Sequence, residues 1–290
     1  MEKQFHGIPA YRIASHNASA VIGYKGGRLL SYEVNERPTV YFNPEKPLRS
    51  THPCGPIFGP VSTDHAVKDN GQYMIGDSVY RLPQHGILRN ACWNVSYSFD
   101  DKLGLVHENR SFVDNPQYKE SYPFLFSFKQ DFAFFGDALS QNLSFQHLEP
   151  DVNSEKRAPV DLAFHTYFPF VAGMRIPELG ALSFQNETSW GTPSSGMLEN
   201  TVFNDLIPRD WHFDLDGITR LHLVYPDGRI LEAHYSGNPQ KVVLWTNPAE
   251  GNFICIEPVL RGRNSLNRGN AVQVPPNGAV SLGQILQWID

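Results

Sequence analysis

The 290-residue sequence lacks the features with which proteins bind polyanions or cross membranes. It has 24 Lys and Arg against 30 Asp and Glu, and its basic residues form no cluster, which argues against nucleic acid and membrane as partners. No stretch approaches the roughly 18 uninterrupted apolar residues that a membrane-spanning helix needs. Residues 1–21 also lack the basic start and apolar run of a signal peptide, so we expect a cytoplasmic protein.

Cysteine is scarce, and the common cofactor motifs are missing. Cys54, Cys92 and Cys255 are odd in number and show no metal-site spacing, so we expect reduced and mostly buried thiols. The 11 histidines include no paired spacing typical of metal ligands, although a metal site assembled from distant residues stays open. The sequence has no nucleophile elbow, dinucleotide-binding glycine motif or phosphate-binding loop, which excludes the commonest cofactor and nucleotide sites.

The sequence does contain many short aromatic and β-branched runs separated by turns. Such runs occupy residues 122–135, 218–225, 241–246 and 252–257. Turn signals separate them and recur elsewhere, for example at 136–137, 225–229, 250–252 and 275–280. The 22 prolines and 23 glycines interrupt most candidate helices. No low-complexity linker divides the chain, so we expect an all-β protein with a large antiparallel architecture and a single domain over residues 1–290.

The stretch "DLAFHTYFPF" at 161–170 combines a core strand with a polar group. Read with a period of two, its even-numbered residues are nearly all apolar and predict a face packed in a core. The other face carries His165 in its middle and Tyr167 two residues later. A lone histidine is usually a satisfied core residue. Because the opposite face is already apolar, however, His165 could instead line a cleft and need a partner or a ligand.

The stretch "LPQHGILRN" at 82–90 follows a proline turn. If it is extended, His85, Ile87 and Arg89 project from one side, and Gly86 lets a ligand or another backbone approach. A structural role, in which His85 caps a neighbouring segment after the turn, is about equally consistent with these residues.

The stretch "NFICIEPVLRGRNSLN" at 252–267 places a carboxylate at the end of an apolar strand. Glu257 shares one strand face with Cys255 and is followed by Pro258. A carboxylate in this position either forms a salt bridge with Arg261 or Arg263, or stays free to take up a proton. The residues of this stretch alone favour the salt bridge.

Taken in order, these three stretches resemble the aldose 1-epimerase (galactose mutarotase) family. "RLPQHGILRN" is similar to the H-G-F-A-R segment of the branch with hexose-6-phosphate and lactose-operon mutarotase-like proteins. "FHTYF" is similar to the family's H-P/T-Y-F strand, and "ICIEPV" to its I-E-P-W strand. The likeness extends to "NPEKPL…GPIFGPVS" and covers residues from about 40 to 285. Each motif is weak by itself, and the ordered set of three is fairly specific.

The resemblance implies a single-domain β-supersandwich with a sugar cleft on its concave face, and a mutarotase that needs no cofactor or metal. Opening the hemiacetal requires a base at the anomeric hydroxyl and an acid at the ring oxygen. A carboxylate and an imidazole, with ordinary pKa values of roughly 4.3 and 6.5, can exchange protons in both directions. The resemblance assigns Glu257 as the base and His165 as the acid, with His85 holding a sugar oxygen. Arg89 would support His85 or bind substrate.

The resemblance also implies a substrate-orienting acid between the second and third motifs. We assign it to Asp205, with Asn200 or Asp210 as alternatives. Trp245 could supply an apolar wall for a sugar ring, but an ordinary core tryptophan is at least as consistent with its surroundings.

Departures from the family pattern bear on the substrate. The galactose branch has an arginine where this chain reads "GPVSTD", and the phosphate-selective branch has one before that segment, where this chain has His52 with Arg49 upstream. Arg89 alone would offer few hydrogen-bond donors to a phosphate, because recognition of a dianion usually uses two or more donor groups. Val259 replaces the usual tryptophan after the Glu-Pro pair.

Three hypotheses follow from this reading. The leading hypothesis is a mutarotase for a free hexose or related aldose. The alternatives are a hexose-6-phosphate 1-epimerase and a non-catalytic sugar-binding protein of the same fold. The expected partner is a small-molecule sugar, and the oligomeric state is left open between monomer and homodimer.

Overall fold

The computed structural model describes residues 3–63, 70–100, 105–113, 118–151, 154–186 and 195–289. Within these residues, the regular structure is almost entirely β, as the turn-separated runs predict, and the strand pairings within the sheets are antiparallel. The helical elements described are two short 3₁₀ helices, η1 (Leu88–Asn90) and η3 (Pro177–Ala181). None of the described helices has the length and apolar character to span a membrane.

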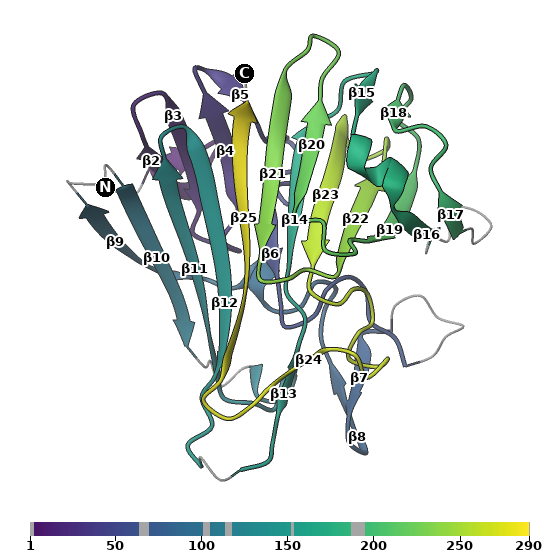
Figure 1. The fold of residues 1–290 in the computed structure, drawn as a ribbon. Coiled ribbons are helices and arrows are strands. Elements are labelled where there is room, and N and C mark those ends of the chain that lie inside the picture. The colour runs from purple at the N-terminus through teal and green to yellow at the C-terminus, as the bar shows by residue number, and fades with distance from the viewer. Residues whose placement is uncertain are drawn as a thin grey trace.

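Two large sheets form the body of the molecule (Figure 1). The nine-stranded sheet has, in spatial order, β18 (Val202–Phe203), β15 (Met174–Arg175), β20 (Arg220–Val224), β21 (Ile230–Ser236), β25 (Ala279–Ile289), β12 (Ala138–His147), β11 (Phe126–Phe135), β10 (Leu105–Val113) and β9 (Asn94–Asp100). The seven-stranded sheet has β17 (Ser195–Met197), β16 (Ser183–Asn186), β19 (Arg209–Asp214), β22 (Lys241–Thr246), β23 (Phe253–Val259), β14 (Ala163–Pro169) and β6 (His52–Cys54).

Three smaller sheets complete the architecture. The N-terminal sheet contains β1 (Lys3–Phe5), β2 (Ile8–Ala14), β3 (Ala18–Gly23), β4 (Leu29–Val34) and β5 (Arg37–Pro38) in sequence order. Two pairs, β7 (Gln72–Ile75) with β8 (Ser78–Arg81) and β13 (Ala158–Val160) with β24 (Val272–Val274), lie below the large sheets in Figure 1. These arrangements confirm the predicted antiparallel β-supersandwich.

The core lies between the two large sheets, and β14 shows how the sequence pattern forms it. The even-numbered side chains Phe164 and Phe168 are buried in the two main hydrophobic clusters with residues of the nine-stranded sheet. Between them, the Thr166 hydroxyl donates to Oε1 of Gln284 on β25 at 3.0 Å. The odd-numbered His165 and Tyr167 belong to the opposite face, so the predicted division of this strand is confirmed.

Asp161, two residues before the start of β14, has a structural role. Asp161 is fully buried, and its carboxylate accepts hydrogen bonds from the backbone N–H of Arg261 and Gly262 and from the Ser265 hydroxyl. Burial raises the pKa of Asp161 to about 7, and the three donors act in the opposite direction. This carboxylate therefore holds the loop that follows β23 against the segment that leads into β14.

Candidate active site

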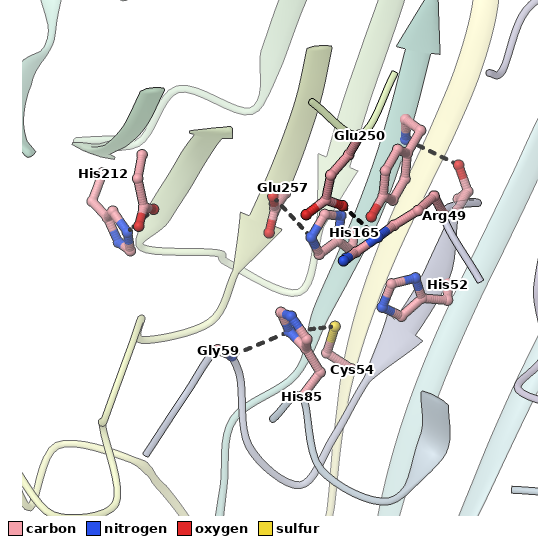
Figure 2. A network of polar contacts seen from close by, with 12 residues as sticks. Arg49, His52, Cys54, Gly59, His85, His165, His212, Glu250 and Glu257 are labelled. Carbon is pink, nitrogen blue, oxygen red and sulfur yellow. Dashed lines mark hydrogen bonds and ion pairs between the residues drawn. The ribbon is translucent and has the colours of Figure 1, made fainter. Parts of the chain in front are cut away.

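A cleft of about 220 Å³ opens on the face of the seven-stranded sheet that is turned away from the core. Its lining combines acids, bases and cations with the apolar side chains of Phe58, Val243 and Trp245. The polar lining includes Arg49, His85, His165, Asp210, His212 and Glu257. Figure 2 shows His165 of β14, His212 of β19 and Glu257 of β23 together with Arg49, which precedes β6, and His85, which lies in a loop.

Strand register brings His165 and Glu257 together. Tyr167 on β14 pairs with Cys255 on β23, and the strands are antiparallel. In antiparallel strands, the residue two positions before Tyr167 lies opposite the residue two positions after Cys255. These residues are His165 and Glu257, so both side chains project from the same face. Nε2 of His165 is 3.4 Å from Oε1 of Glu257. Among the described residues, Glu257 therefore contacts His165, in place of the predicted salt bridge with Arg261 or Arg263.

Burial shifts the pKa values of this pair in opposite directions. Burial lowers the pKa of His165 well below its usual 6.5, and His85 and three nearby arginines add to the effect. Burial also raises the pKa of Glu257 well above 4.5, with a further contribution from Asp210. Both shifts favour the neutral forms, so we expect the pair to hold one proton that either partner can carry.

His85 reaches the cleft by a route that differs from the predicted extended segment. Its φ is +65°, and η1 begins three residues later, so the residues after His85 do not alternate as in a strand. Gly86 also has a positive φ, and a Cβ there would lie 2.2 Å from the carbonyl oxygen of Gly55. The glycine thus admits another backbone segment, one of the two predicted alternatives.

The protonation of His85 is set by its buried neighbours. The Gly59 N–H donates to Nδ1 of His85 at 3.3 Å, and the Cys54 sulfur lies 3.4 Å from the same nitrogen. Burial, with Arg89 as the next contribution, lowers the pKa of His85 to about 3. The ring is therefore neutral, and its Nε2 carries the proton, because Nδ1 accepts from a backbone amide. His85 can donate one hydrogen bond to a bound oxygen.

Arg89 does not line the cleft. It lies within η1, where its carbonyl oxygen accepts from the Arg28 guanidinium at 3.2 Å. Its charge still acts on the cleft, because it contributes to the lowered pKa values of His85 and His165. Of the two predicted roles, support of His85 is consistent with this position, and direct contact with a ligand in the cleft is not.

The choice of Asp205 as the orienting acid does not agree with the structure. Asp205 is exposed, lies outside the cleft, and uses its carbonyl oxygen to accept from Arg209. Asn200 is also exposed. The alternative, Asp210, is the second residue of β19, and its side chain projects into the cleft. Asp205 belongs to the loop before β19, which begins only at Arg209. The composition of this segment does not reveal where the strand begins.

Sequence reasoning missed two ionisable side chains that line the cleft, His212 and Glu250. His212 on β19 is buried, and its Nε2 is 3.0 Å from Oδ1 of Asp210. The alternation within "RDWHFD" could have indicated that these two residues share a face. Glu250, from the turn between β22 and β23, forms an ion pair with Arg49 at the cleft. No sequence signal links Arg49 to Glu250, because 200 residues separate them.

Trp245 has both of its predicted environments. It lines the cleft and packs edge-on against His165 with ring centroids 5.5 Å apart, while it also contacts buried residues such as Phe253. The cysteines agree with expectation in part, since Cys54 and Cys255 are buried and free, whereas Cys92 is exposed and free.

One group among the described residues has potential metal ligands close together. His165, Cys255 and Glu257 each offer a ligand atom within 4.8 Å of the others. Burial raises the pKa of the Cys255 thiol well above 9, however, which disfavours the thiolate that a metal would require. The donor set fits proton exchange between His165 and Glu257 better than metal ligation.

Comparison with known proteins agrees with the fold and the motif order. A family model described as aldose 1-epimerase matches residues 9–271. A search of curated proteins finds no match. Among solved structures, Slr1438 from Synechocystis sp. PCC 6803 has a TM-score of 0.82 and 22% identity over 99% of this chain and 97% of its own.

Two further solved structures with this fold carry names of the family. A galactose mutarotase-like protein from Clostridium acetobutylicum has a TM-score of 0.79 and 18% identity over 100% of this chain and 98% of its own. A putative aldose 1-epimerase from Escherichia coli K12 has a TM-score of 0.75 and 16% identity over 97% of this chain and 98% of its own. At these identities the likeness shows the fold, while the family model covers most of the sequence. The chain belongs to the aldose 1-epimerase family.

Proposed function

We propose that this protein interconverts the α and β anomers of a neutral hexose or related aldose by acid and base catalysis. The observation that carries the proposal is the separation of 3.4 Å between Nε2 of His165 and Oε1 of Glu257 at a cleft large enough to admit a ligand. Family membership implies an isomerase-type activity on small sugars. The two side chains supply the acid and the base that ring opening requires.

The proposed reaction transfers two protons and breaks and re-forms one carbon–oxygen bond of the sugar. The Glu257 carboxylate takes the proton of the anomeric hydroxyl, the bond between the anomeric carbon and the ring oxygen breaks, and protonated His165 gives its proton to that oxygen. The aldehyde then presents its other face, and the ring closes as the same protons return. Each step conserves charge and needs no oxidant or reductant. The neutral pair that the pKa shifts favour holds the same single proton as the reactive pair, in which that proton lies on His165, so one proton transfer between the two side chains reaches the reactive pair.

The remaining cleft residues suit the binding of a polyol. His85 offers a neutral N–H donor, whereas Asp210 offers carboxylate oxygens that accept hydrogen bonds from hydroxyl groups. The half-buried ring of Trp245 provides an apolar surface on which the C–H face of a sugar can pack. We therefore propose Asp210, in place of Asp205, as the substrate-orienting acid.

The cleft charges favour a neutral substrate. Arg49 is a cation that a phosphate could use, but it already forms an ion pair with Glu250. Asp210 and Glu257 add further acidic groups to the same cleft. Arg263 also lines the cleft, and its presence with Arg49 is the observation that favours a hexose-6-phosphate substrate as the second candidate.

Polarimetry of freshly dissolved α-glucose and α-galactose tests the proposal. We expect the wild type to accelerate anomer exchange over buffer, and Glu257→Gln or His165→Asn to reduce kcat by about 10²–10⁴-fold. The exposed Glu155→Gln variant is the matched control and should keep full activity. Circular dichroism and the melting temperature check that each variant is folded.

The other outcomes discriminate the alternatives. Acceleration with glucose 6-phosphate but not with free sugars would replace the neutral substrate by the phosphorylated one. Sugar binding by calorimetry without acceleration of either would indicate a binding protein. Full activity in both Glu257→Gln and His165→Asn would contradict the assigned acid and base.

A further inference from the structure

Three buried polar atoms near His165 have no hydrogen-bond partner among the described residues. They are Nδ1 of His165, Nε2 of His52 and the hydroxyl oxygen of Tyr167. The three residues are at most 5% exposed. A buried polar atom without a partner is destabilising, so such atoms usually form hydrogen bonds to an ordered water.

The rings of His165, His52 and Tyr167 are close neighbours. His165 pairs with His52 across β14 and β6, and Tyr167 follows two residues later on the same face. The His165 ring stacks on His52 with centroids 5.0 Å apart and on Tyr167 with centroids 4.7 Å apart. The centroids of His52 and Tyr167 are 6.4 Å apart, so the three rings form a compact triangle. Figure 2 shows His165 between Glu257 and His52.

The direction of the hydrogen bonds is fixed at the His52 end. Nδ1 of His52 is 2.8 Å from the carbonyl oxygen of Ser50. A carbonyl oxygen only accepts, so this nitrogen carries the proton of the neutral ring. Burial and the nearby Arg28 lower the pKa of His52 well below 6.5, which agrees with a neutral ring. Nε2 of His52 is therefore an acceptor that needs a donor.

The direction at the His165 end follows from the proposed reaction. Nε2 of His165 faces Glu257 and exchanges the catalytic proton. A neutral imidazole can take up a proton at Nε2 only if its own proton is on Nδ1. That Nδ1–H is buried and needs an acceptor, which no described protein group provides.

We propose that one internal water links these three atoms and holds His165 in the tautomer with its proton on Nδ1. The water accepts from Nδ1–H of His165 and from the Tyr167 hydroxyl, and it donates to Nε2 of His52. Three hydrogen bonds are the usual number for a buried water. His52 and Tyr167 are then positioning residues, which act on the reaction through His165. This inference rests on the proposed function for the role of Nε2.

The first test is the tautomer of His165 in the resting wild-type protein, measured by long-range ¹H–¹⁵N NMR near neutral pH. His165→Asn identifies the signal by its loss. We expect a protonated Nδ1 and an unprotonated Nε2. A proton on Nε2 would overturn the proposal. This measurement needs no turnover, so its failure is distinct from a failure of the proposed activity.

The second test compares two substitutions of His52. His52→Gln keeps an acceptor oxygen at the same number of bonds from the backbone, whereas His52→Leu offers none. We expect His52→Leu to reduce kcat by about 10–100-fold. KM should change little, because His52 does not line the cleft in the described structure. His52→Gln should recover most of kcat. Equal kcat in wild type and His52→Leu would overturn the proposal.

Tyr167→Phe keeps the test decisive if His52→Leu does not fold. This substitution removes only the hydroxyl and leaves the ring that stacks on His165. We expect a fall in kcat of about threefold to tenfold, since one of three hydrogen bonds to the water is lost. A tautomer and a kcat identical to those of the wild type would overturn the role of this hydroxyl.

Discussion

At the scale of single residues, the cleft depends on side chains whose ionisation is set by burial. His165 and Glu257 are 5% and 2% exposed, and each is pushed toward its neutral form. A pair in this condition stores one proton without a net charge, which a low-dielectric site tolerates better than two isolated ions. His85 nearby is neutral and keeps a fixed tautomer, which is consistent with the proposed division of sugar binding and proton exchange between two histidines.

The pH dependence of kcat/KM should reflect this shared proton. Activity requires one proton on the pair, so it is lost at low pH when His165 also becomes protonated and at high pH when Glu257 ionises. Because the pKa of His165 is lowered, we expect the acid limb below pH 6.5, and because that of Glu257 is raised, we expect the alkaline limb above pH 4.5. Polarimetry that extends well below pH 6.5 and well above pH 4.5 measures both limbs. An acid limb at or above 6.5 would contradict the lowered histidine pKa.

Glu250 should influence the choice between neutral and phosphorylated sugars. Glu250→Gln removes the negative partner of Arg49 and leaves this cation to interact with a substrate dianion. We expect the ratio of kcat/KM for glucose 6-phosphate to that for glucose to rise about fivefold, as loss of an ion pair worth about 1 kcal/mol implies. Glu155→Gln, on an exposed carboxylate, should leave the ratio unchanged. An unchanged ratio in Glu250→Gln would show that Arg49 does not reach the substrate.

At the scale of elements, β14 connects the cleft to the core. One face carries His165 and Tyr167, and the other packs into the space between the large sheets. A buried polar chain crosses that space, because Thr166 donates to Gln284, and Gln284 in turn donates to Gln141 on β12. Hydrogen bonds in such a chain require an aligned register of the two sheets, which also fixes the position of His165.

Thr166→Val should test the contribution of this chain to stability. The substitution keeps the shape of the side chain but leaves Oε1 of Gln284 without its donor. We expect a loss of about 1–3 kcal/mol in the free energy of unfolding, the cost of a buried unpaired polar atom. Urea denaturation measures the loss, with the exposed Thr219→Val as the control. A change within ~0.5 kcal/mol, as for ordinary surface substitutions, would mean that Gln284 finds another partner.

At the scale of the whole molecule, one hydrophobic cluster joins all three of the larger sheets. Tyr32 on β4, Phe134 on β11 and Ile254 on β23 belong to the same buried cluster. The Tyr32 hydroxyl also donates to the carbonyl oxygen of Leu286 on β25 at 3.0 Å. The buried apolar side chains of the N-terminal sheet therefore belong to the core of the supersandwich.

We accordingly propose that residues 1–290 unfold as one domain. Calorimetry should show one transition whose enthalpy equals the van't Hoff value, and tryptophan fluorescence and circular dichroism should change together. Trp93, Trp245 and Trp288 lie in different parts of the fold and report on it together. A separate early transition would instead indicate that the N-terminal sheet unfolds alone.

The sequence by itself determined the β architecture and the two faces of the catalytic strands. Alternation within 161–170 and 252–257 is a local property, because successive side chains of a strand point to opposite sides. It therefore predicted that His165 lies on the face opposite the apolar one and that Glu257 shares a strand face with Cys255, and the order of the motifs indicated the family.

Tertiary structure alone decided the rest of the cleft. The register between β14 and β23 places His165 opposite Glu257. The start of β19 selects Asp210 over Asp205, and the approach of Gly55 to Gly86 fixes the turn at His85. The ion pair of Arg49 with Glu250 joins residues that are distant in sequence. These features depend on contacts between separate segments, and the local composition of neither segment encodes such contacts.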